Sequence, residues 1–71
     1  MDLTIKMIWD PDARVWVAES EDVPGLVLES GSFDALLERV RIAVPELLAL
    51  NRTNTPLTLN FQSERRERLA F

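Results

Sequence analysis

Acidic side chains are the groups in this sequence that could carry chemistry, and two close sets of them occur in its first half. Asp10 and Asp12 flank Pro11, and a pair of carboxylates can supply the oxygen ligands that Mg²⁺ needs in nuclease chemistry. Asp and Pro are also the residues that type I turns favour at their first two positions. We therefore expect residues 10–13 to form a solvated turn and predict no metal site.

The second acidic set is Glu19, Glu21 and Asp22, which follows a segment rich in valine and tryptophan. Three carboxylates within four residues form a negative surface patch, and such a patch steers a positively charged protein toward it. We expect these three residues to dock a basic partner.

Several classes of catalyst are excluded because the 71 residues include no histidine, no cysteine and no tyrosine. Ser-His-Asp and Cys-His nucleophiles, histidine bases and zinc sites built from Cys and His all need residues that are missing. No pair of acids lies in an apolar stretch where burial would make it reactive. We predict a binding protein with no enzymatic activity and no cofactor.

Charge is distributed unevenly along the chain, whose net charge is −4. Residues 1–50 contain ten acidic and four basic side chains, whereas residues 51–71 contain four arginines and two glutamates. An acidic body does not attract phosphate backbones, so we expect no direct binding of nucleic acid.

The C-terminal arginines, Arg65, Arg66 and Arg68, are interleaved with glutamates. This mixture favours a solvated or partner-docking tail, in which Leu69 and Phe71 would supply the apolar contact. No run of residues approaches the roughly 18 apolar residues that cross a bilayer. The acid at position 2 and the lack of a long apolar run argue against a signal peptide. We therefore predict a cytoplasmic protein that does not contact membranes.

Alternation of apolar and polar residues predicts a hairpin at the start of the chain. Its first strand covers residues 3–10 and its second covers residues 14–20, with residues 10–13 as a four-residue loop. In this register Trp9 faces Arg14, and Met7 faces Trp16. Shorter apolar runs predict strands at 26–30 and 56–62, the latter after a polar loop at 51–55.

One long helix is predicted after Gly31, with Ser32 as its N-cap and Asp34 in its first turn. Its apolar stripe consists of Phe33, Leu36, Leu37, Val40, Val44, Leu47 and Leu48. Pro45 removes one backbone hydrogen bond, so we expect a kink or a break near Ala43 and a restart at Pro45.

The order β-β-β-α-β predicts a single α+β domain over residues 1–62, a small and mostly antiparallel sheet with one helix packed on one face. Residues 63–71 would form a charged C-terminal tail. Within it, Glu64 and Arg68 are spaced to support a short helix.

One helix can cover only one face of this sheet, so the other face is predicted to expose Ile8, Val15 and Val17, with Val27 as a further member. A domain of this length buries about 60% of its unfolded surface, and oligomerisation is a usual source of the missing stability. We expect a homo-oligomer, a dimer because twofold symmetry is the commonest, with a tetramer as the alternative. Trp16 has two open roles: an interface anchor or a core residue against the helix.

The hairpin with Val15-Trp16-Val17-Ala18, the turn Glu21-Asp22-Val23-Pro24-Gly25 and the helix start Gly-Ser-Phe-Asp-Ala-Leu-Leu-Glu-Arg together resemble the N-terminal domain of HicB-type antitoxins. The segment Val44-Pro45-Glu46-Leu47-Leu48 is similar to short uncharacterised HicB-like proteins that lack a DNA-binding domain.

This resemblance implies a partial RNase H-like fold and a role in binding and silencing a basic HicA-type mRNA interferase. It also implies that the catalytic carboxylates of RNase H enzymes are missing. The alternative is a self-associating structural or adaptor module that has no toxin partner.

Overall fold

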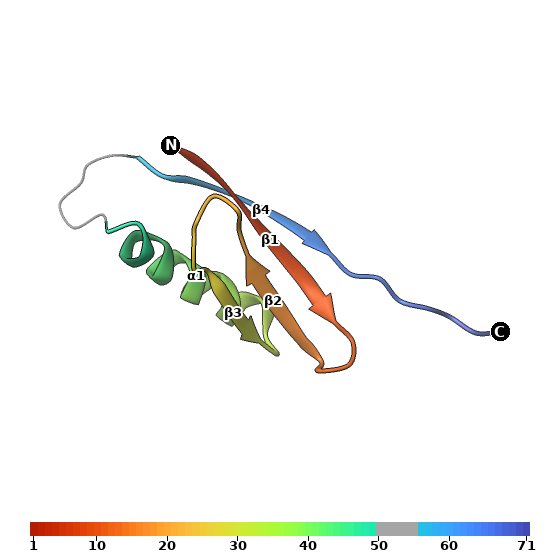
Figure 1. Cartoon of the computed structure of the whole chain (residues 1–71). Coiled ribbons are helices and arrows are strands. Elements are labelled where there is room, and N and C mark those ends of the chain that lie inside the picture. Colours follow the sequence, from red (N-terminus) through yellow and green to blue (C-terminus); the bar gives the residue numbers. More distant parts are fainter. Residues whose placement is uncertain (50–55) are drawn as a thin grey trace.

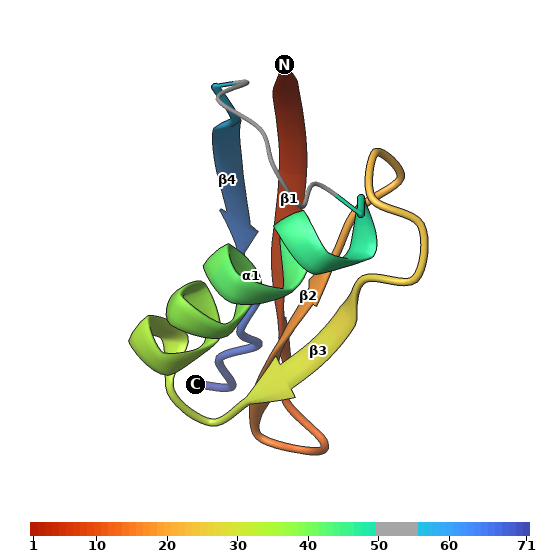
Figure 2. The ribbon, with the colours of Figure 1, turned by 90° about the vertical axis from the view of Figure 1, so that its left-hand side faces the viewer.

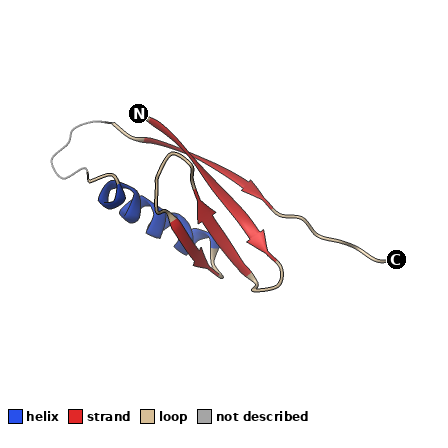
Figure 3. Cartoon of the chain, viewed as in Figure 1, coloured by secondary structure: helices blue, strands red, loops and turns tan. Residues whose placement is uncertain are grey.

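The computed structural model of the chain describes residues 1–49 and 56–71, and it confirms the predicted β-β-β-α-β order (Figures 1 and 3). The elements are β1 (Asp2–Asp10), β2 (Val15–Glu19), β3 (Val27–Ser30), α1 (Phe33–Leu47) and β4 (Thr58–Glu64). The predicted polar loop at 51–55 lies outside the described residues.

The four strands form one mixed sheet in the order β3-β2-β1-β4. The β1–β2 and β2–β3 pairs are antiparallel, while β4 pairs with β1 in parallel. A parallel neighbour requires a crossover connection, and α1 lies on that crossover between β3 and β4. The helix therefore covers one face of the sheet, and no helix among the described residues covers the other (Figure 2).

The hairpin register differs from the predicted one by two residues. Trp9 pairs with Trp16, and Met7 pairs with Ala18 instead of Trp16. The turn is displaced because Asp10 still belongs to β1, where its Oδ1 accepts hydrogen bonds from the backbone N–H groups of residues 12 (3.0 Å) and 13 (3.2 Å). Arg14 closes the turn in the left-handed region, at φ 55°. A shift of two residues leaves every side chain on its predicted face.

The core lies between the sheet and α1. Its fully buried members are Leu3, Ile5, Met7 and Ala18 from the sheet, Val23 and Leu26 from the loop before β3, and Leu36, Val40 and Val44 from the helix. The helix begins at the predicted N-cap, because Ser32 Oγ accepts a hydrogen bond from the backbone N–H of Ala35 at 3.2 Å.

Of the two outcomes predicted at Pro45, a kink or a break, the break does not occur, since α1 runs unbroken to Leu47. Pro45 lies close to the helix end, so the lost N–H is confined to the last turn. Two further backbone bonds close that turn: Leu48 N–H donates to Val44 O at 3.0 Å, and Ala49 N–H donates to Glu46 O at 3.1 Å.

The C-terminal segment also departs from expectation. Strand β4 starts at Thr58 and continues to Glu64, two residues past the boundary assigned to the domain. The short helix does not form, and Arg65 Nε instead pairs with Glu67 Oε1 at 2.8 Å. Residues 65–71, called the arm from here on, extend past the β1–β2 turn and give the molecule a long axis of 54 Å (Figure 1).

Candidate protein-binding face

The sheet face opposite α1, called the outer face from here on, presents a short apolar strip. Ile8 pairs with Val17, and Val15 occupies the next outer position of β2. Because strand side chains alternate, these three residues lie opposite Met7 and Ala18, which face the core. All three are half-buried within the chain, and Val27, near the edge of the strip, is 72% exposed.

Carboxylates flank this strip on three sides. Glu29 pairs with Val17, Glu64 pairs with Ile8, and Asp10 pairs with Val15. Across the four strands, the outer positions carry five acidic residues and one basic residue, namely Asp2, Asp10, Glu19, Glu29, Glu64 and Lys6. The outer face therefore offers a basic partner an apolar centre and a negative rim.

The acidic set at the end of β2 divides into two roles. Asp22 Oδ2 accepts a hydrogen bond from the backbone N–H of Thr4 at 2.7 Å. Ser20 Oγ donates to Thr4 O at 2.6 Å and accepts from Asp22 N–H at 3.0 Å. Thr4 lies beyond the last β1–β2 pair, so these side chains satisfy backbone groups that the ladder leaves open. Asp22 therefore supports the fold, and its role in docking stays a prediction.

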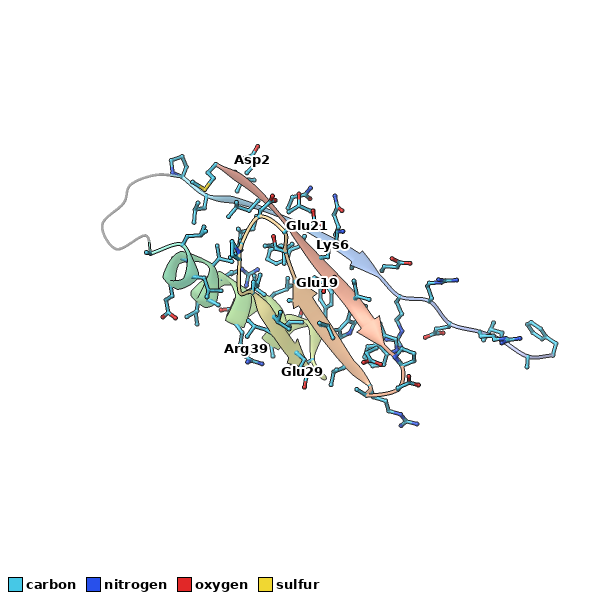
Figure 4. All side chains as sticks on the ribbon, viewed as in Figure 1. Asp2, Lys6, Glu19, Glu21, Glu29 and Arg39 are labelled. Atoms are coloured by element: carbon cyan, nitrogen blue, oxygen red, sulfur yellow. The ribbon has the colours of Figure 1, made fainter. Side chains whose placement is uncertain are left out.

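Glu19 and Glu21 remain available to solvent. Together with Lys6, Ser20, Gly25, Leu26 and Val27 they line a shallow hollow between the outer face and the loop after β2. Within residues 1–49 and 56–71, neither glutamate forms an ion pair. Figure 4 shows Glu19, Glu21 and Lys6 close together at this end of the sheet. We call Glu19, Glu21 and Val27 the acidic corner.

Trp16 lies on the helix side of the sheet, away from the apolar strip. Its ring contacts Phe33 at the start of α1, with centroids 4.9 Å apart, and Trp9 across the hairpin at 5.4 Å. Both pairs are edge-to-face, the arrangement that ring quadrupoles favour. The Arg65 guanidinium lies 4.2 Å from the centroid of the Trp9 ring, so it caps this aromatic cluster.

The aromatic cluster was not predicted from the sequence, although its signal was present. Trp9 and Trp16 face each other only when the turn is placed at residues 11–14, and the predicted turn, at residues 10–13, was one residue earlier. The core role that was left open for Trp16 agrees with its half-buried position against Phe33.

Leu69 and Phe71 lie near the free end of the arm, where Leu69 is 71% exposed and Phe71 is fully exposed. The structure does not bring them together with the apolar strip or the acidic corner of their own chain (Figure 1). They remain candidates for contact with another molecule.

Among the residues that the structure describes, we find neither a cluster that could bind a metal ion nor a helix that could span a membrane. No three acidic side chains converge there as a metal ion would require. The helix in this part of the chain is too short and too polar to cross a membrane.

Comparison with known proteins places this fold in a family. No curated protein matches the chain. The crystal structure of a hypothetical protein from the extremely thermophilic bacterium Thermus thermophilus is similar, with 39% sequence identity, full coverage of both chains and a TM-score of 0.71. The family model described as a domain of unknown function, DUF1902, matches residues 2–71. The chain therefore belongs to the DUF1902 family.

Proposed function

We propose that this protein is an antitoxin-type binding protein that sequesters a basic, HicA-type mRNA interferase by protein–protein contact. The observation that carries the proposal is the outer face, which no helix of residues 1–49 and 56–71 covers and which combines apolar side chains with five carboxylates and one lysine. A surface of this composition attracts a basic protein over long range and then offers it apolar area to bury.

The fold supports the same proposal. The order β3-β2-β1-β4, with β4 parallel to β1 and one helix on the crossover, agrees with the partial RNase H-like fold that the resemblance to HicB-type antitoxins implies. The sequence without histidine or cysteine also suits a protein that acts by binding.

We place the toxin contact at the acidic corner. Glu19 and Glu21 border a hollow that could receive a lysine or arginine side chain, and Val27 supplies exposed apolar surface beside it. Charge-assisted hydrogen bonds from a guanidinium to two carboxylates are among the stronger contacts between proteins. Neither glutamate has to leave an existing ion pair within the described residues to make them.

The proposal requires a small basic protein encoded by a neighbouring reading frame, and the test is co-expression with that protein. We expect the two proteins to co-purify and this protein to relieve the growth arrest that the toxin causes. The double variant Glu19→Lys/Glu21→Lys should lose both effects because it reverses the charge of the acidic corner.

The matched control is Glu38→Lys/Glu46→Lys, which changes the net charge equally but on the exposed side of α1. It should retain both effects. If the unmodified protein neither co-purifies with its neighbour nor restores growth, the antitoxin proposal is wrong.

The second candidate is a self-associating structural or adaptor module with no toxin partner. The apolar strip favours it, because Ile8, Val15 and Val17 would be buried between two copies as readily as under a toxin. A protein that forms a stable homo-oligomer and binds no neighbouring basic protein would fit this candidate instead. In either case we propose a cytoplasmic protein without catalytic activity.

A further inference from the structure

The arm has a composition that complements the outer face. It carries Arg66 and Arg68, followed by Leu69 and Phe71, and all four are exposed. In an extended segment, Leu69 and Phe71 share one side and Arg66 and Arg68 share the other. The apolar side could pack on Ile8, Val15 and Val17 while the long arginine side chains reach the carboxylates at the rim.

The arm begins on the helix side of its own sheet. Its first residue, Arg65, lies over the rings of Trp9 (4.2 Å) and Trp16 (5.9 Å), which belong to that side. Arg66 and Arg68 line a hollow beside the hairpin, which Ile8 at the near end of the strip also borders, and the remaining residues continue past the hairpin (Figure 1). The exposed end of the arm, with Leu69 and Phe71, is thus free to reach the strip of another copy.

We propose that the arm of one copy covers the apolar strip on the outer face of a second copy, and that the second arm does the same in return. Two identical copies can satisfy both surfaces at once because the exchange is reciprocal about a twofold axis. Arg66 and Arg68 then lie among Asp10, Glu29 and Glu64. The proposal goes beyond the antitoxin function, because it assigns the apolar strip and its rim to a second copy and leaves the toxin the acidic corner, with Val27 as the apolar surface there.

Light scattering on the purified protein at micromolar concentration is the first test. The full chain should have a mass of at least two chains of 8.1 kDa, whereas a chain ending at Glu67 should have the mass of one. The shortened chain keeps Arg65 and its partners, so unchanged circular dichroism would show that it folds. A monomeric full chain, or a shortened chain that still associates, would overturn the proposal.

The lack of cysteine allows the contact itself to be mapped. A Phe71→Cys protein mixed with a Val17→Cys protein should form a mixed disulfide about tenfold faster than the control mixture of Phe71→Cys with Ile42→Cys. Ile42 is 62% exposed on α1, so its cysteine is more accessible than one at the half-buried Val17 but lies away from the outer face. Equal rates for the two mixtures would overturn the proposed location. Both tests use this protein alone, so their failure would leave the toxin experiment unaffected.

Discussion

On the helix side of β1, Leu3, Ile5 and Met7 are at most 5% exposed. On the outer side of the same strand, Lys6 is exposed and Thr4 and Ile8 are half-buried. The helix side is wholly apolar along this strand, while the outer side mixes apolar, polar and charged groups. Both sides come from one alternating sequence. The difference shows that the one helix formed by the described residues completes one face of the sheet, whereas the second face keeps the mixed composition of a surface.

The largest predicted effect compares two isoleucines on the two sides of β1. Ile5→Ala removes a fully buried side chain and should lower the free energy of unfolding by about 2–5 kcal/mol, enough to unfold much of a domain this small. Ile8→Ala removes a half-buried one and should cost about 1 kcal/mol or less in the isolated chain. Urea unfolding of the two variants measures the difference. Equal losses would mean that the outer face is as much a core as the helix side.

Measuring Ile5→Ala and Ile8→Ala at several protein concentrations separates contacts within one chain from contacts between copies. Only contacts between copies make stability concentration-dependent, so the loss from Ile8→Ala should grow as the protein is concentrated. The loss from Ile5→Ala should stay constant. An Ile8→Ala loss that is also constant would argue against burial of the strip between copies.

The two faces also show what the sequence could predict. Alternation and capping were sufficient for the strands, the N-cap at Ser32 and the assignment of Ile8, Val15 and Val17 to the face without a helix. The register was predicted wrongly because the turn depends on Arg14 adopting a positive φ. Non-glycine residues seldom adopt this conformation, so the sequence gives no signal for it.

The role of Asp22 was missed for a related reason. Its hydrogen bond joins it to Thr4, eighteen residues earlier, and no local pattern marks such a contact. At Pro45 the predicted break was wrong, because the proline lies in the last turn of α1, where the loss of one backbone hydrogen bond does not end the helix.

The next largest effect separates carboxylates that hold the fold from those available to a partner. Asp22→Ala leaves the Thr4 N–H without its acceptor and should cost about 1–2 kcal/mol. Glu21→Ala, one residue away and free of ion pairs within the described residues, should change stability by less than about 0.5 kcal/mol. Amide hydrogen exchange at Thr4 should accelerate only in the Asp22 variant. Acceleration in both would show that the loop, rather than the Asp22 carboxylate, protects this amide.

A smaller effect concerns the attachment of the arm to the helix side. Arg65→Ala removes the guanidinium over Trp9 and should cost about 0.5–1 kcal/mol. It should also change tryptophan fluorescence, because Trp9 becomes more exposed to water. Arg66→Ala is the matched control, since Arg66 makes no cation–π contact within residues 1–49 and 56–71. Identical spectra for the two variants would show that Arg65 does not hold the arm at the hairpin.

The smallest predicted effect contrasts a paired carboxylate on the helix with a carboxylate on the outer face. Glu38 on α1 pairs with Arg41, so Glu38→Gln should lower stability by a few tenths of a kcal/mol. This loss should disappear in 1 M salt, where the screening length is about 3 Å. Glu29 lies opposite Val17, and the Arg39 guanidinium donates to its backbone O at 2.7 Å, so Glu29→Gln should change the stability of the chain ending at Glu67 by no more than a few tenths of a kcal/mol. In the full chain, arginines of a second copy would surround Glu29, and Glu29→Gln should then weaken the dimer. A dimer of unchanged stability would show that no arm reaches this part of the outer face.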